Sequence, residues 1–332
     1  MSAATVPSVL VEATAPPERR GIERDGVRLL VTDRANRSHA HARFYDLPSM
    51  LRAGDLLVVN DSATLPAAVS ARRSNGDAFA LHVSTMIDAR IWTAEPRASV
   101  VCGEELQLPD GGSAVAIAPV DPEHPRLWYV WFHLPVPMNE YLARVGEPIR
   151  YGYVTQRFPL ADYQTMFARE PGSSEMPSAA RPFTPRVVAG LRARGISLAT
   201  ITLHCSVASF ERPERPAMER FTISAAAAAA VNAARAQGRR AIAVGTTALR
   251  ALESAVVDGQ IVASAGWTDL VIDADSRVRA VDGLLTGFHD PAATHVWMLR
   301  AFLDRELLAS AYNEAAERAY AYHEFGDVHL IL

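Results

Sequence analysis

The stretch "AIAVGTTALRALES" (residues 241–254) decides the fold class of this chain. Its four apolar residues predict a buried strand, Gly245 predicts a tight turn, and the residues after it predict a helix that begins at two threonines. Similar strands and helices follow residue 150, including a strand at 197–205 and an Ala-rich helix from residue 225 that Ser224 caps. Strands that alternate with helices predict an α/β fold, with a mostly parallel sheet and flanking helices.

Residues 67–133 depart from this alternation, because short runs such as "AFALHVS" and "RLWYVWFH" are separated by Gly, Pro and Asp. Short strands with turn residues between them predict an antiparallel, barrel-like β module. The predicted organisation is a flexible N-terminal lead (1–27), an α/β main domain (28–66 plus 150–332) and an inserted β-barrel-like domain (67–149). Other elements expected in the main domain are strands at 28–34, 54–61, 268–272 and 325–332 and helices at 185–195 and 293–319.

The composition excludes several classes of protein. Hydrophobic residues make up 49% of the 332 and charged residues 21%, which is typical of a soluble globular protein, and no apolar run is long enough for a membrane span. All 33 basic residues are Arg, so a Schiff-base lysine and a P-loop lysine are both excluded. The two cysteines and the absence of a secretory signal favour a cytoplasmic location.

The net charge of -4 does not favour a nucleic-acid binder, although Arg-rich stretches at 181–195 and 211–220 could contact phosphate. Solvated surface is the more common role of such stretches. The ten histidines show no metal-binding spacing, and dinucleotide, Walker and nucleophile-elbow motifs are missing. No metal and no membrane partner are therefore expected.

Thr246 and Thr247 lie where the predicted helix begins, and unpaired N–H groups there suit a carboxylate or phosphate. An ordinary N-cap is the alternative role. Arg250 and Glu253, three residues apart on the same helix, either pair with each other or face a ligand.

Other candidates lie in loops and at strand ends. Trp267 next to Thr268 and Asp269 could stack on a flat ring and bind its edge, or could be structural. The loop 281–291 carries Phe288 and His289 between Gly283, Gly287 and Pro291, and His289 is either an acid–base group or structural. The remaining candidates are His204 at the end of a strand, Arg169 before a Gly turn, and Asp61 and Ser62 after an apolar strand.

Together these stretches are similar to one known family. The matching pieces, in chain order, are "RLLVTDR", "RAGDLLVVND", "YQTMFAREPG", "TLH", "AIAVGTTALRALES", "GWTDLVI", "VDGLLTGFH" and "FGDVHLI". Over about residues 28 to 332 the chain resembles the S-adenosylmethionine:tRNA ribosyltransferase-isomerase family of queuosine biosynthesis.

The resemblance implies a fold and a reaction. The implied fold is an α/β domain with an inserted β-barrel. The implied enzyme transfers and rearranges the ribosyl part of S-adenosylmethionine onto 7-aminomethyl-7-deazaguanine in tRNA, giving epoxyqueuosine and releasing adenine and methionine. S-adenosylmethionine is then a consumed substrate, and no cofactor is needed.

The resemblance also implies roles for the candidates. His204, His289 and Asp282 become the catalytic candidates, and Thr246 with Thr247 would hold the methionine carboxylate or a phosphate. The implied substrate-binding residues are Asp61, Ser62, Arg169, Thr246, Thr247, Arg250, Glu253, Trp267, Thr268, Asp269 and Phe288.

Departures from the family pattern suggest a divergent member or paralogue. Residues 177–184 read "PSAARPFT" where the family reads P-T-A-G-L-H-F-T, so Arg181 and Pro182 replace a Leu and a His. The segment "CSVASF" (205–210) lacks two glycines, and "SATLPAAV" (62–69) lacks two arginines, which weakens the expected binding of tRNA. The alternatives to the family reaction are a small acceptor, a lyase-like cleavage and a non-catalytic binding protein.

Overall fold

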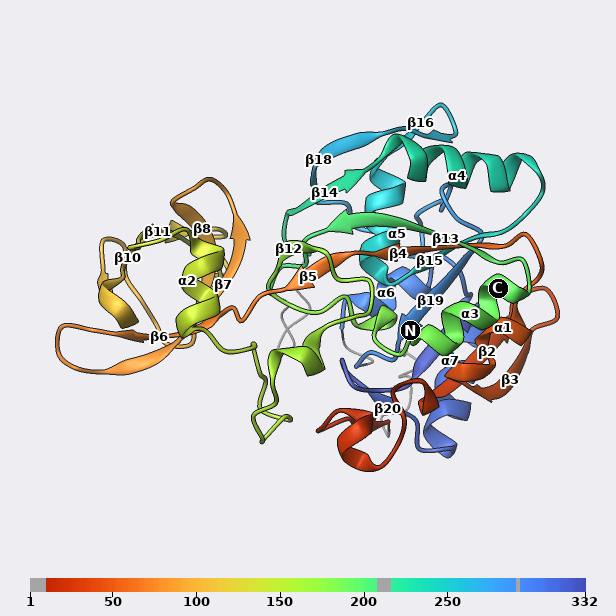
Figure 1. The fold of residues 1–332 in the computed structure, drawn as a ribbon, viewed down its shortest axis with the longest axis horizontal. Coiled ribbons are helices and arrows are strands. Elements are labelled where there is room, and N and C mark those ends of the chain that lie inside the picture. Colours follow the sequence, from red (N-terminus) through yellow and green to blue (C-terminus); the bar gives the residue numbers. More distant parts are fainter. Residues whose placement is uncertain (1–9, 208–215, 291–292) are drawn as a thin grey trace, which may run out of the picture.

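The computed structural model describes residues 10–207, 216–290 and 293–332, and within them nine strands form one sheet (Figure 1). Across the sheet these are β18 (Ser264–Thr268), β14 (Glu219–Ile223), β13 (Ser197–Leu203), β4 (Leu56–Asn60), β15 (Ala241–Val244), β19 (Gly283–Gly287), β21 (Val328–Ile331), β2 (Arg28–Asp33) and β3 (Ser38–Arg43). The four central strands β13, β4, β15 and β19 run parallel, and antiparallel pairs flank them. The predicted α/β class with a parallel core is confirmed.

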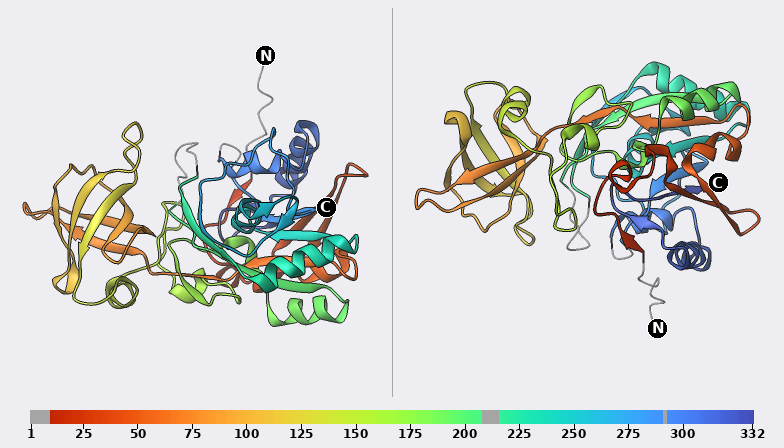
Figure 2. Two further views of the ribbon diagram at one scale, coloured as in Figure 1. Left: turned by 90° about the horizontal axis from the view of Figure 1, so that it is seen from above. Right: turned by 60° about the horizontal axis from the view of Figure 1, so that its bottom comes forward.

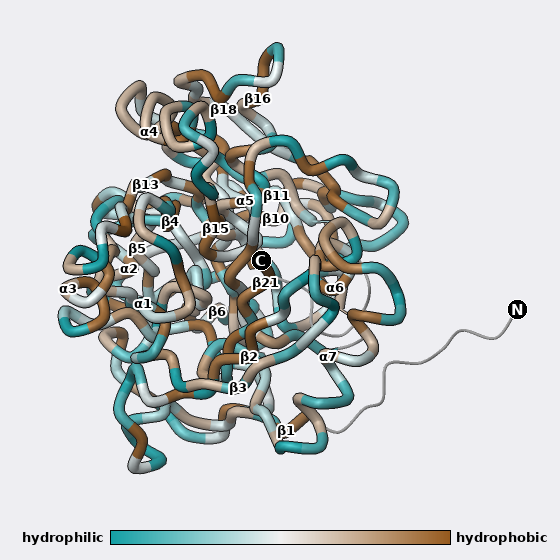
Figure 3. The backbone as a smooth tube through the Cα atoms, turned by 90° about the vertical axis from the view of Figure 1, so that its right-hand side faces the viewer, coloured by the Kyte–Doolittle hydropathy of each residue, from teal (hydrophilic) through white to brown (hydrophobic). Residues whose placement is uncertain are grey.

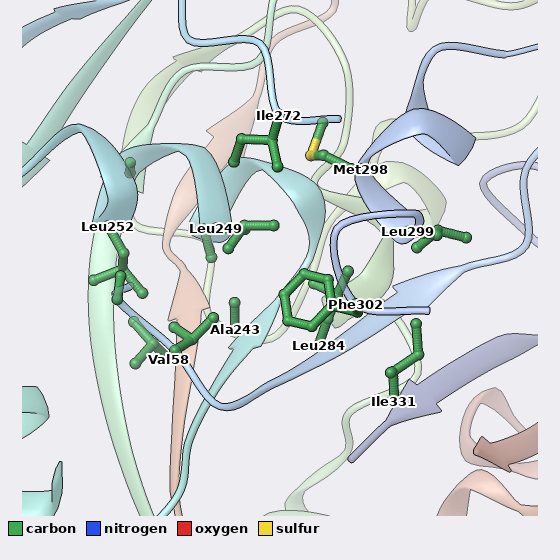
Figure 4. Close-up of a cluster of buried hydrophobic side chains, with 14 of the residues drawn as sticks. Val58, Ala243, Leu249, Leu252, Ile272, Leu284, Met298, Leu299, Phe302 and Ile331 are labelled. Carbon is green, nitrogen blue, oxygen red and sulfur yellow. The ribbon is translucent and has the colours of Figure 1, made fainter. Parts of the chain in front are cut away.

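The central strands are apolar on both faces because helices cover both faces. Val58 and Ala243 pack in one buried cluster with α4 and α5 (Figure 4), while Leu57 and Ile242 pack on the other face with α1 and α3. The helices of the described residues are α1 (Leu47–Met50), α2 (Met138–Val145), α3 (Pro185–Ala193), α4 (Ala225–Ala236), α5 (Thr246–Ser254), α6 (His295–Leu299) and α7 (Arg305–Glu317). Figure 3 shows the resulting hydrophobic segments of β2, β15 and β21 in the middle of the molecule.

A closed antiparallel barrel lies to one side of the main sheet (Figures 1 and 2). Its strands are β6 (Ala68–Arg72), β7 (Ala78–Met86), β8 (Ile91–Pro96), β9 (Glu105–Gln107), β10 (Ser113–Pro119) and β11 (Trp128–His133). α2 packs on the apolar core of the barrel. A β-bridge between Ala68 and Glu147 joins the segment that enters the barrel to the segment that leaves it. The predicted barrel is confirmed, and 67–149 stays our proposal for the bounds of the insert.

Short strand pairs complete the described fold. They are β5 (Ser62–Thr64) with β12 (Glu170–Ser173), β16 (Val256–Val257) with β17 (Gln260–Ile261), and β1 (Val11–Glu12) with β20 (Ala321–Tyr322). In the described part of the chain, no helix has the length and apolarity needed to cross a membrane.

Two expected elements differ from the structure. The helix expected at 293–319 is two helices, because Asp304 has an extended backbone and accepts a hydrogen bond from the Leu307 N–H, so that α7 begins afresh there. The strand expected at 268–272 ends at Thr268, because the Thr268 hydroxyl accepts a hydrogen bond from the Leu270 N–H and the chain turns.

The lead expected to be flexible is instead packed from Leu10 to Val27. Ala13 is buried, and Glu18 forms an ion pair with the buried Arg181 at 3.0 Å. Asp25, also buried, accepts hydrogen bonds from Thr184 and Arg186. The sequence pattern missed these contacts because they join residues more than 150 positions apart.

Candidate functional site

A pocket opens where the carboxyl ends of the parallel strands meet the chain returning from the barrel. Ser206 lines it after β13, Thr246 after β15, Gly287 at the end of β19, and Tyr151 on the barrel side. Ligands of open α/β sheets bind at this edge. The pocket is therefore our candidate for the functional site.

The start of α5 forms one wall of the pocket. Gly245 has φ +94° and ψ 151°, a conformation that glycine adopts far more readily than other residues, and it turns the chain from β15 into the helix. Among the described residues no side chain caps the first turn of α5, and Thr247 uses its hydroxyl to accept a hydrogen bond from Asn60 at 3.2 Å. Free helix N–H groups beside Thr246 can therefore bind an anion.

Arg250 lines the same pocket but its guanidinium is largely satisfied by protein. It is 4% exposed, forms an ion pair with Glu219 and donates to the carbonyls of Leu270 and Thr268 at 3.0 and 3.2 Å. Arg250 thus joins α5 to the edge strands and sets the shape of the pocket wall.

Of the two alternatives for Arg250 and Glu253, a pair between them or contact with a ligand, the pair does not form. Glu253 does not line the pocket but accepts hydrogen bonds from the N–H groups of Arg279 and Ala280, at 2.8 and 2.6 Å. It holds the loop before β19, so the structure gives it no substrate contact.

Two histidines stack on the opposite wall. The rings of His289 and His295 lie 4.5 Å apart and 7° from parallel, and His289 Nε2 lies 3.0 Å from the Thr286 hydroxyl. Burial lowers the pKa of His289 well below its usual value and that of His295 to about 4. Both rings are neutral at pH 7, so each has a nitrogen that can accept a proton.

Carboxylates and tyrosines form the third wall. The Tyr151 hydroxyl donates a hydrogen bond to Glu175, and the Tyr153 hydroxyl donates to Glu324. The two tyrosine rings stack 6.2 Å apart, so both pairs lie side by side, and Tyr153 also stacks on His323 at 3.7 Å. Burial raises the pKa of Glu324.

Asp282, expected to be catalytic, does not line this pocket. It precedes β19, while the pocket lies at the other end of that strand. Its carboxylate accepts a hydrogen bond from the Ala241 N–H at 2.9 Å and so holds the start of β15 beside β19.

His204, Asp61 and Ser62 gather behind the pocket wall. His204 Nδ1 lies 2.8 Å from the Ser62 hydroxyl, which also bonds Ser173 at 2.6 Å, and burial lowers the pKa of His204. Asp61 accepts a hydrogen bond from Thr202 at 2.6 Å. None of these three lines the pocket, and their contacts join β5, β12 and β13.

The other expected residues divide between core and surface. Phe288 is buried against Tyr312 and touches the pocket, and buried Thr268 bonds Ser254 at 2.6 Å. The exposed residues Arg169, Trp267 and Asp269 lie outside the pocket, and the Arg220 guanidinium covers the Trp267 ring at 5.9 Å. Pro291 and the first part of the Arg-rich stretch 211–220 lie outside the described residues.

Sequence reasoning missed the acidic wall. Tyr151, Tyr153 and Glu175 stand in loops without a periodic pattern, and Glu324 lies 149 positions beyond Glu175. The available signal was the repeated tyrosine of "YGYV" (151–154), two residues apart and so on one side of an extended chain.

The family model described as "Queuosine biosynthesis protein" matches residues 6–331. The chain belongs to this family. It is 38% identical over 323 residues to the S-adenosylmethionine:tRNA ribosyltransferase-isomerase of Moorella thermoacetica, covering 93% of this chain and 94% of that protein. It is 36% identical over 338 residues to the enzyme of the same name from Thermus thermophilus, covering 96% and 97%.

The solved structures include a similar protein. The crystal structure of S-adenosylmethionine tRNA ribosyltransferase from Thermotoga maritima matches with a TM-score of 0.56 and 26% identity, covering 97% of this chain and 96% of that one. The predicted membership of the queuosine biosynthesis family is therefore confirmed.

Arg181 stands where the queuosine biosynthesis family pattern has Leu, and its side chain has a structural role. Arg181 is 2% exposed, and its guanidinium donates to the Asp162 carbonyl at 2.9 Å and lies over the Phe325 ring at 5.1 Å. Together with Glu18 it binds the N-terminal segment to the pocket's outer wall, which is lined by the adjacent Glu324.

Proposed function

We propose that this protein is an S-adenosylmethionine-consuming ribosyltransferase-isomerase that acts on 7-aminomethyl-7-deazaguanine in tRNA. It transfers and rearranges the ribosyl group to give epoxyqueuosine, and adenine and methionine leave. The names of its near full-length relatives support this activity. We expect the reaction in the cytoplasm, with S-adenosylmethionine as a consumed substrate and without a metal.

The observation that carries the proposal is that one pocket is lined both by the start of α5 and by the stacked histidines. Free N–H groups at the start of α5 suit a carboxylate or phosphate, and neutral histidines suit proton transfer. The sulfonium acidifies the neighbouring ribose carbon, so a base beside it can begin the rearrangement. Of the catalytic candidates His289 is the one that lines the pocket, and we assign it this role.

The test is to incubate the purified protein with S-adenosylmethionine and tRNA carrying 7-aminomethyl-7-deazaguanine. Adenine and methionine should appear in equal amounts, and their release should require the tRNA. Release without tRNA would support the small-acceptor or lyase alternative. No release under either condition would contradict the proposal.

The salt dependence of the affinity for tRNA provides a second test of whether the protein binds the tRNA backbone. Contacts with phosphate release counterions, so the logarithm of the affinity should fall linearly with the logarithm of the salt concentration. An affinity that does not respond to salt would contradict a role for the tRNA backbone.

A further inference from the structure

Three buried hydroxyls belong to residues that line the pocket, and they have no hydrogen-bond partner among the described residues. They are Thr64 Oγ1, Tyr163 OH and Ser174 Oγ, and their residues are 4%, 4% and 1% exposed. The neighbouring Ser173 does not line the pocket, and its hydroxyl is paired with that of Ser62 at 2.6 Å. Buried polar atoms are nearly always paired, so the three unpaired hydroxyls indicate a polar ligand in the pocket.

Adjacent segments of the chain bring these three residues to one wall. The Gln164 side chain accepts a hydrogen bond from the Thr64 N–H at 2.9 Å and donates one to the Thr64 carbonyl at 2.7 Å, which holds the segment with Tyr163 beside β5. Thr64 also pairs in register with Ser173 of β12, and Ser174 follows Ser173 in the chain. The segments that carry the other two hydroxyls therefore both contact Thr64.

The chemistry of a hydroxyl restricts the kind of ligand. Each hydroxyl has one O–H donor and two lone pairs that accept hydrogen bonds. A phosphate or carboxylate offers only acceptors and an ammonium only donors, so either would leave one side of each hydroxyl unpaired. A vicinal diol carries both donor and acceptor character on each of its two oxygens, and so it can pair both sides.

We propose that Thr64, Tyr163 and Ser174 form a binding site for the vicinal diol of a sugar. This inference rests on the proposed function for the identity of the sugar. There the diol is that of the ribosyl group of S-adenosylmethionine, because a ribose inside the tRNA chain has its 3′ oxygen bonded to phosphate. The three residues then hold the group that is transferred, while the start of α5 and His289 line other walls of the same pocket.

The experiment measures binding by calorimetry to the full-length wild type, Thr64→Val, Tyr163→Phe and Ser174→Ala. The probes are S-adenosylhomocysteine and its 2′,3′-dideoxy analogue, which lacks the diol. Each variant should lose about three- to tenfold in affinity for the diol-bearing probe, which is the effect of one neutral hydrogen bond, and less than about twofold for the dideoxy probe.

Urea denaturation of the ligand-free proteins separates a binding role from a structural one. Removing a hydroxyl that has no protein partner should leave the free energy of unfolding unchanged or raise it. A clear loss of stability in all three variants would assign the hydroxyls to the folded structure and overturn the site. Tyr45→Phe, which removes the hydroxyl of an exposed tyrosine outside the pocket, should bind both probes as the wild type does.

Equal losses for both probes, no loss for either, or no binding of the diol-bearing probe to the wild type would also overturn the diol site. If the wild type still releases adenine and methionine from S-adenosylmethionine, only the site is wrong and the proposed function stands. If the wild type consumes no S-adenosylmethionine but the variants lose the diol-bearing probe selectively, the site stands without that function.

Discussion

At the scale of the residue, Gly245 sets the geometry of the pocket wall at the start of α5. Its backbone lies in a region that only glycine readily adopts, and a Cβ atom there would lie 3.5 Å from the Ala179 Cβ. This turn determines where the side chains of the next two residues lie. Thr246 lines the pocket, and Thr247 is held by Asn60.

Gly245→Ala should weaken binding of S-adenosylmethionine at least tenfold, because relief of the strain rotates the first N–H groups of α5. The backbone strain should also lower the free energy of unfolding by roughly 1–3 kcal/mol. Calorimetry and urea denaturation measure the two effects. Gly238→Ala, also at positive φ but outside the pocket, should lose stability and keep its affinity. Unchanged affinity in Gly245→Ala would contradict a role for this turn.

His289 provides a second prediction at this scale. His289→Gln keeps a polar side chain but removes the proton acceptor, so kcat for S-adenosylmethionine consumption should fall about 100-fold. The KM should change little. Rates from quantified adenine release test this, with His133→Gln on the barrel surface as the matched control. A variant with wild-type kcat would rule out His289 as the base.

At the scale of the element, caps and breaks decide where helices begin. Ser224 accepts a hydrogen bond from the Ala227 N–H at 3.1 Å, which confirms the predicted cap of α4. Asp304 does the same for α7 and so divides the helix that the apolar pattern predicted as continuous. A local polar side chain therefore overrides periodicity at a helix end.

Ser224→Ala should lower the free energy of unfolding by about 1 kcal/mol, because the first turn of α4 loses its side-chain acceptor. Urea denaturation at pH 7 measures the change. Ser197→Ala, at an exposed position of β13 without a side-chain hydrogen bond among the described residues, should change stability by less than half as much. Equal losses in the free energy of unfolding for the two variants would show that the Ser224 cap adds no stability of its own.

At the scale of the whole molecule, the sheet buries a histidine that stays neutral in the folded state. His329 of β21 is fully buried, shares a 2.7 Å hydrogen bond with Thr32 and stacks on Phe288. Burial lowers its pKa to about 3. The unfolded chain therefore binds a proton at His329 below about pH 6.5, which the folded chain does not bind until about pH 3.

Stability should consequently fall as the pH drops below about 6.5. Between pH 7 and pH 5, His329 alone should account for roughly 2 kcal/mol of the loss. In His329→Gln, which keeps a neutral polar group beside Thr32, this part of the pH dependence should disappear. Urea denaturation at both pH values provides the measurement, and an equally steep loss in the variant would contradict the assignment.

The sequence by itself determined the α/β class, the barrel, the cap at Ser224 and the family, because apolar periodicity, turn residues and motif order are local along the chain. The sequence also named Thr246, Thr247, Arg250, Phe288 and His289 as candidates, and all five line the pocket. Only the tertiary structure decided which polar groups share the pocket. Glu175 and Glu324 meet there across 149 positions, and Asp282 lies at the opposite edge of the sheet. The physical reason is that strand order and direction, which depend on packing between distant segments, determine the edge at which each side chain emerges.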